Sequence, residues 1–278
     1  MPAYFDTNVI RYLRTGLNGS LPENLRTRII VSPVSALEVL SQISDAARGE
    51  EALQSIHRFR DWLPPQTVML DWLETFAAYH VFGIEVEDEI FPIIEELLHR
   101  ALAVNDAAEL REGARHLRRI NEQAKLRKAR LFQEAADRLR TANLAAQELD
   151  AQIRRGTALG IEERVGAAPG TRTQAQIEES LAAYCEFHRA SVRRAVQHAG
   201  FRFDSREHLN DHFDGEQLLY LAFPNNHFIT SDRGFNGVTQ TAQGPRLHII
   251  SAVILQNPAT AVPALEGVIA ACTPAHTA

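Results

Sequence analysis

Four acidic side chains stand where the chain passes from one predicted element to the next. Asp6 follows the first apolar strand, and Glu38 lies one turn into the helix after the second strand. Asp214 opens a predicted helix before a later strand, and Asp232 follows that strand. In a parallel α/β sheet, the strand ends and the helix starts that follow them share one edge, where such folds place ligands. The spacing therefore predicts that four carboxylates converge.

Converging carboxylates need a partner for their charge. Two like charges about 4 Å apart repel each other by about 4 kcal/mol at an effective dielectric constant near 20. Either some of them stay protonated or a cation neutralises them. Oxygen ligands favour hard cations, Mg²⁺ or Mn²⁺, and such ions activate water and stabilise both oxygens of an in-line phosphodiester displacement. The residues therefore predict metal-dependent phosphodiester hydrolysis.

Each acid also has an ordinary structural explanation. Ser35-x-x-Glu38 has the spacing of a capping box, in which the glutamate returns to a backbone N–H. Asp6 and Asp214 fit helix caps, and Asp232 fits a turn. The metal hypothesis rests on all four acids falling at one predicted edge.

The elements that would position these acids are short. Continuous apolar runs indicate strands covered on both faces, at 3–5, 29–31, 227–230 and 247–250, with a further candidate at 68–70. Helical patterns lie at 9–13, 37–43, 72–82, from 214 onward and near 261–270. This alternation predicts one α/β domain with a parallel sheet, made of residues 1–87 and 199–278.

A long helical segment interrupts that domain at residues 88–198. Its sequence is rich in Ala, Leu, Arg and Glu, and it has few helix breakers after Pro92. Five glycine and proline positions within 156–173 predict a flexible connection, and 174–198 has the pattern of one more helix. We expect a mainly helical insertion.

The insertion is basic and the rest of the chain is acidic. Residues 111–155 carry 12 basic and 6 acidic side chains, a net charge of +6, so the remainder carries −6 − 6 = −12. Lysine occurs only at Lys125 and Lys128. Arg115 and Arg119, one helical turn apart, fit a surface that follows nucleic-acid phosphates. A solvated helix face with i,i+4 ion pairs explains them slightly better.

Composition excludes several classes of protein. The chain has 278 residues and a formal net charge of −6. Its two cysteines, Cys185 and Cys272, do not make a disulfide framework. No apolar run reaches the roughly 20 residues that span a bilayer, and Asp6 and Arg11 lie where a signal peptide would be apolar. We expect a soluble cytoplasmic protein that does not insert into membranes.

Four motifs resemble those of the PIN-domain nucleases: Tyr4-Phe5-Asp6-Thr7-Asn8, Ser35-Ala36-Leu37-Glu38, Asp214 with Leu218 and Ala222, and Thr230-Ser231-Asp232-Arg233-Gly234-Phe235. The resemblance covers 1–82 and 203–256, and Asp211 is a rival for the third acid. It implies a three-layer α/β/α fold with a parallel central sheet. The 176 residues between Glu38 and Asp214 depart from a minimal core, so the role of the insertion cannot be carried over.

The resemblance also implies a metal centre. Asp6, Glu38, Asp214 and Asp232 would hold Mg²⁺ or Mn²⁺ and carry the catalysis. Asp6 and Asp214 would bind the ion directly, whereas Glu38 or Asp232 would act through water.

Substrate contacts follow from the same motifs. Asn8, Thr230 and Arg233 would orient ligands or the scissile phosphate, and Arg115 and Arg119 would bind RNA further away. The implied activity is endoribonucleolytic. The family is used in toxin–antitoxin systems, which allows an inhibitory protein partner, and apolar positions of the insertion allow a homodimer.

Other functions stay open at this stage. The same centre would serve a structure-specific DNA nuclease, with the insertion gripping the strand. A PIN-like module that binds RNA or protein without catalysis is a further alternative. A phosphatase of the haloacid dehalogenase type is disfavoured, because Asn8 stands where its second aspartate belongs.

Overall fold

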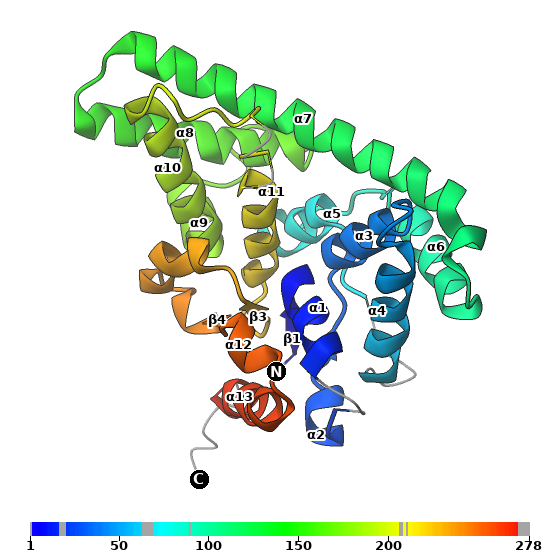
Figure 1. The fold of residues 1–278 in the computed structure, drawn as a ribbon. Coiled ribbons are helices and arrows are strands. Elements are labelled where there is room, and N and C mark those ends of the chain that lie inside the picture. The colour runs from blue at the N-terminus through cyan, green and yellow to red at the C-terminus, as the bar shows by residue number, and fades with distance from the viewer. Residues whose placement is uncertain are drawn as a thin grey trace.

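The computed structural model describes residues 2–16, 21–62, 69–88, 90–205, 208–209 and 211–271. The chain is mostly helical around a small four-stranded sheet, ordered β2-β1-β3-β4, in which all neighbours are parallel. The strands are β1 (Ala3–Phe5), β2 (Ile29–Ile30), β3 (His227–Thr230) and β4 (Leu247–Ile249). The fold is therefore a mixture of α and β structure, with the sheet at its centre (Figure 1).

The two faces of the sheet bury two separate cores. Because side chains alternate along a strand, Tyr4 enters one core while Ala3 and Phe5 enter the other. On the first face, the ring of Tyr4 stacks on that of Phe228 with centroids 4.9 Å apart. On the second face, Phe5 and Ile229 pack with residues of α1 (Thr7–Gly16) and α13 (Pro258–Ala271). Burial on both faces explains why these strands have no polar alternation.

Helices cover both faces of the sheet. The shorter ones are α2 (Glu23–Arg26), α3 (Pro33–Gln42), α4 (Gly49–Trp62), α5 (Leu73–Ala77), α6 (Phe91–Ala103), α9 (Gln174–Ser180), α11 (Asp211–Glu216) and α12 (Ala252–Leu255). A π-helix follows α5, η1 (Ala78–Phe82), and 3-10 turns complete the set: η2 (Ala107–Leu110), η3 (Gln217–Ala222), η4 (Arg233–Gln240) and η5 (Gly244–Arg246). No helix in these described ranges is long and apolar enough to cross a membrane.

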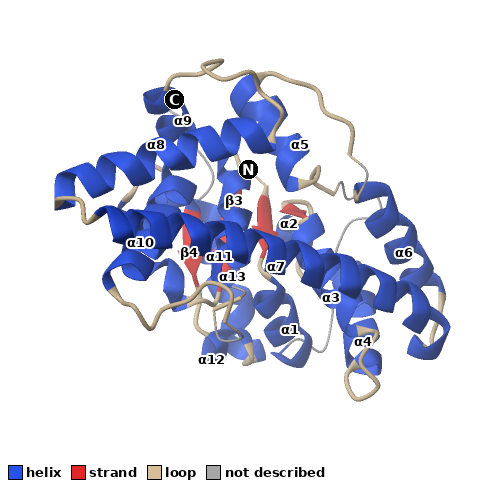
Figure 2. Cartoon of the chain, turned by 90° about the horizontal axis from the view of Figure 1, so that it is seen from above, coloured by secondary structure: helices blue, strands red, loops and turns tan. Residues whose placement is uncertain are grey.

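The insertion is built on the 32-residue helix α7 (Arg111–Ala142), which passes over the sheet (Figures 1 and 2). It ends at Asn143 in the left-handed region, with φ at 46°. The chain then returns through α8 (Ala146–Arg164) and α10 (Ala182–Gln197), which pack together. Leu117 and Ile161 of these helices belong to the same core as Tyr4, so the insertion and the sheet share one core.

Several sequence predictions differ from the structure in their details. The predicted connection at 156–173 starts too early, because α8 continues through Gly156 and Gly160 to Arg164. A glycine weakens a helix by roughly 1 kcal/mol, and buried Ile153 and Ile161 of α8 offset that loss. The helix predicted at 174–198 is divided into α9 and α10 at Leu181.

Two further predictions need correction near the sheet. Asp214 does not open its helix, since α11 already begins at Asp211 and gives way to η3 after Glu216. Met69 makes an isolated bridge with Val31 in place of a full strand. Val68, the first residue of that predicted strand, lies outside the described residues, as does the side chain of Asp211.

Candidate functional site

The ends of β1 and β3 bring Asp6 and Thr230 side by side. Phe5 pairs with Ile229 in the parallel register, so the next residue on each strand leaves the sheet at the same edge. The Thr230 hydroxyl donates to Oδ2 of Asp6 at 2.9 Å. Asp6 is 6% exposed, and it also accepts the backbone N–H of Asn8 at the start of α1. Asp6 is therefore both a helix cap and a member of the edge cluster.

Glu38 does not act as a capping residue. Ser32 caps α3 by accepting from the Ser35 N–H, and the Ser35 hydroxyl donates to the Phe5 carbonyl at 2.8 Å. The capping-box explanation is therefore wrong for Glu38. Instead, Thr7 donates its hydroxyl to Oε2 of Glu38 at 2.6 Å, which holds the carboxylate beside the end of β1.

Asp232 and Asp214 approach from the other side of the edge. Asp232 accepts the Gly234 N–H at 2.7 Å as the cap of η4, and its own N–H donates to the Thr230 hydroxyl at 3.0 Å. Asp214 sits in α11, where a side chain on the neighbouring Gly215 would come within 2.3 Å of the Phe187 ring. Only glycine allows α11 to pack so closely, and this packing positions Asp214.

The pKa values of Asp6 and Asp214 are raised in part by the neighbouring acids. Burial raises the pKa of Asp6 to about 6, Glu38 raises it further, and hydrogen bonds from Thr230, Gln217 and Asn8 oppose the shift. Burial also raises the pKa of Asp214, with Glu38, Asp6 and Asp232 adding to the rise and Lys125 lowering it. The structure thus brings Asp214 within electrostatic reach of the three other predicted acids, and Asp6 within reach of Glu38.

Lys125 brings a positive charge to this group of acids. Its Nζ atom lies 3.1 Å from Oε1 of Glu38, and its side chain is only 9% exposed. It projects from the buried stripe of α7, whose members are Ala114, Leu117, Asn121, Lys125, Ala129, Gln133 and Ala136. Sequence reasoning missed this residue, although the restriction of lysine to positions 125 and 128 in an arginine-rich chain was visible.

A second ionic cluster lies next to Asp214 along the chain. Glu216, 1% exposed, accepts from Lys128 at 2.8 Å and from Arg164 at 2.9 Å, and Glu74 accepts from the same two cations at 3.3 and 2.7 Å. Burial works to raise the pKa of Glu74, but Arg164 and Lys128 lower it to about 2. This cluster ties α5, α7, α8 and α11 together, and so fixes the insertion against the site.

The donor set fits a hard cation in its chemistry. It consists of carboxylate oxygens, the type of ligand that hard cations prefer. Two of the carboxyl groups, Asp6 and Asp214, have a raised pKa because they are buried near other acids. Among the described residues, however, no three Asp, Glu, His or Cys side chains are grouped so that they could hold a metal ion as they stand. The two oxygens of Glu38 are engaged by Thr7 and Lys125 instead.

The predicted substrate residues are more dispersed. Asn8 lies beside Asp6 and accepts from Arg11 at 3.4 Å. Arg233 is exposed at the start of η4, close in sequence to Asp232. Arg115 and Arg119 are exposed on α7 and bond to Arg111 and His116 of the same helix, so the structure does not bring them to the carboxylates.

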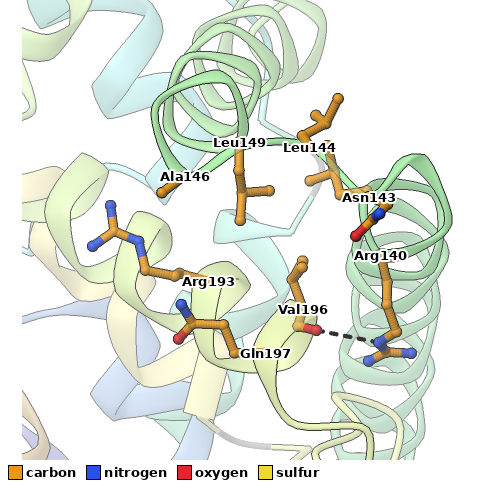
Figure 3. A pocket seen from close by; sticks show the side chains of 9 residues that line it. Arg140, Asn143, Leu144, Ala146, Leu149, Arg193, Val196 and Gln197 are labelled. Atoms are coloured by element: carbon orange, nitrogen blue, oxygen red, sulfur yellow. Dashed lines mark hydrogen bonds between the residues drawn. The ribbon is translucent and has the colours of Figure 1, made fainter.

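A separate hollow of about 480 Å³ lies at the far end of the insertion, between α7, α8 and α10 (Figure 3). Its two arginines already have partners. Arg140 donates to the carbonyls of Val196 and Ala195, and Arg193 pairs with Asp150. Because both arginines are already paired, this hollow is a weaker candidate site than the acidic edge, the name we give to Asp6, Glu38, Asp214 and Asp232.

Comparison with protein-family models, with curated proteins and with solved structures found no match to this chain.

Proposed function

We propose that this chain is a divalent-metal-dependent endoribonuclease with a PIN-like three-layer fold, acting in the cytosol. The observation that carries the proposal is that Glu38, Asp6 and Asp232 all act on Asp214, next to the edge where the parallel strands β1 and β3 end. Such a concentration of buried negative charge is unfavourable without a cation. A phosphodiester approaching this edge needs that same cation, because it is anionic as well.

Some residues of the edge would bind the metal ion, and others orient the residues that bind it. Asp6 and Asp214 would bind the ion directly, and Glu38 and Asp232 would act through water. When bound, the ion would activate water and neutralise the charge that develops on the phosphate. Thr230 keeps the Asp6 carboxylate in one orientation, and Asn8 adds a backbone N–H to the same carboxylate.

The exposed arginines of α7 suit the binding of RNA away from the site. The insertion carries a net charge of +6 over 111–155, whereas the rest of the chain is acidic. A basic helix beside an acidic centre offsets the repulsion of the substrate by the body of the protein. Arg115 and Arg119 would make phosphate contacts that do not depend on sequence.

A non-catalytic PIN-like module that binds RNA or protein is the second candidate. It is favoured by the Lys125–Glu38 ion pair, which already neutralises one of the carboxylates. In that case the acidic edge would be a structural remnant, and binding would depend on α7 alone.

A cleavage assay separates these candidates. Pools of RNA and of DNA with matched sequences are incubated with the protein in Mg²⁺ or Mn²⁺, with and without EDTA. We expect cleavage of RNA that EDTA abolishes, and no cleavage by Asp214→Asn. Asp61→Asn, at an exposed residue paired with Arg60, is the matched control and should cleave normally. Cleavage of DNA alone would assign a DNA nuclease, and binding without cleavage would assign the module.

A further inference from the structure

Lys125 enters the acidic edge from the insertion, far from the strands in sequence. It lies 87 residues from Glu38, and its Nζ atom contacts Oε1 of that carboxylate. An ammonium so shielded from water is stable only beside opposite charge. Its charge also reaches Asp214. The edge therefore already contains a cation, supplied by the protein itself.

The residue type is informative. Lys125 and Lys128 are the only lysines of the chain, and both lie on α7 and pair with carboxylates of the body. An ammonium is a compact point charge, whereas a guanidinium is a broad planar group. A compact charge resembles a small ion more closely than an arginine would. Lysine at position 125 therefore suits a site where its ammonium group and a small metal ion could replace each other.

A divalent ion that reaches Glu38 through one of its waters would compete with the present partners Thr7 and Lys125 for the carboxylate oxygens. Thr7 is fixed at the start of α1 and is fully packed, with 2% exposure. Lys125 carries its charge on a flexible four-carbon stem. Lys125 is therefore the partner that can be displaced.

An alternative acceptor for the ammonium is present on the same helix. Asn121 lies one turn before Lys125 on the buried stripe and is 7% exposed. Its Oδ1 atom is buried and has no hydrogen-bond partner among the described residues. Side chains four residues apart on a helix are neighbours. An ammonium that withdraws from Glu38 would meet this unused oxygen.

We propose that Lys125 is a built-in counter-cation of the acidic edge, which a divalent ion displaces from Glu38 toward Asn121. This inference rests on the metal site of the proposed function. Without the ion, Lys125 neutralises the edge and keeps α7 seated over it. With the ion, the ammonium withdraws, and the ion pair between α7 and α3 is lost while their apolar packing stays.

The presence of only two lysines makes this exchange directly observable. Protein labelled with ¹³C at the lysine ε-carbon should give two NMR signals, which Lys128→Arg assigns by removing one. During titration with Mg²⁺, we expect the Lys125 signal to shift and the Lys128 signal to stay. A Lys125 signal that does not move while Mg²⁺ binds, as measured by calorimetry, would overturn the proposal.

Metal affinity gives an independent test. Lys125→Met should bind Mn²⁺ at least about tenfold more tightly than the unaltered chain, because the competing charge is gone. Lys128→Arg keeps its charge and should bind as the unaltered chain does. Equal affinity in Lys125→Met, or weaker affinity, would refute the exchange but leave the metal site intact.

Failure of the proposed function looks different. In that case no variant binds Mn²⁺, and EDTA changes nothing. If Lys125→Met does not fold, the NMR titration still decides, because it needs only the unaltered chain and Lys128→Arg.

Discussion

Thr230 donates its hydroxyl proton to Oδ2 of Asp6 at 2.9 Å, although the two residues are 224 positions apart. The same hydroxyl accepts the Asp232 N–H. One side chain therefore orients the Asp6 carboxylate and holds the backbone of Asp232 at the edge of the sheet. This position is buried, so the bond is shielded from competing water.

Thr230→Val should remove the hydroxyl that bonds to Asp6 and Asp232 while keeping the shape of the side chain. Losing a hydrogen-bond partner of a buried carboxylate should destabilise the fold by about 1–3 kcal/mol, and cleavage should fall. Thr230→Ser keeps the hydroxyl and should restore most of both. Urea unfolding and RNA cleavage measure the two effects. Equal behaviour of the Val and Ser variants would contradict the role of the hydroxyl.

Asp6→Asn should stabilise the metal-free protein while abolishing cleavage. The pKa of Asp6 is raised from 3.8 to about 6. The folded chain therefore holds the proton more tightly than the unfolded chain, and ionised Asp6 destabilises the fold as pH rises through this window. The variant should gain about 2–3 kcal/mol at pH 7.5 and almost nothing at pH 4. Unfolding of both proteins at the two pH values gives this difference, and a gain of the same size at pH 4 would speak against it.

The buried ionic cluster should be the strongest link between the insertion and the body. Arg164→Met leaves Glu216 and Glu74 with Lys128 as their remaining partner in the cluster. Breaking a buried pair on one side costs about 3–5 kcal/mol. Arg60→Met breaks an exposed pair with Asp61 and should change stability by less than about 1 kcal/mol. Chemical unfolding compares the two variants, and similar losses would show that the cluster is not special.

Two stacked histidines should make the protein sensitive to acid. Nδ1 of His227 lies 3.0 Å from Nε2 of His248, and burial, with His248 nearby, lowers the pKa of His227 to about 4. The unfolded chain takes up this proton near pH 6.5 and the folded chain only near pH 4, so stability is lost as pH falls between these values. His248→Gln should make the dependence of unfolding on pH shallower. An unchanged slope would count against the pair.

The outer face of α7 should bind RNA through charge alone. A double Arg115→Ala, Arg119→Ala variant should weaken binding to all sequences alike, and should reduce the slope of log affinity against log salt by about 1–2. Filter binding to a non-cleaved RNA at several salt concentrations measures this. Arg60→Ala, at an exposed arginine of α4, serves as a control, and the same slope in both variants would remove α7 from the binding surface.

The positions of the site residues that directly follow strands could be predicted from the sequence. Continuous apolar runs predicted β1, β3 and β4, and parallel pairing then required Asp6 and Asp232 to leave the sheet at one edge. The contribution of α7 could not be foreseen, because which face of a basic helix is buried depends on packing. Gly156 and Gly160 misled the prediction for a related reason, since tertiary contacts of α8 outweigh local helix propensity.

The pairing of β1 with β3 has a consequence for synthesis of the protein. Ala3 of β1 pairs with His227 of β3, which is synthesised 227 − 3 = 224 residues later. At roughly 5–20 residues per second on the ribosome, this delay is on the order of ten to forty-five seconds. When His227 is added, the growing polypeptide already has Asp6, Glu38 and Asp214 but still lacks Asp232. The acidic edge is therefore complete only after translation has passed Asp232, at the end of a long interval in which β1 lacks its central partner.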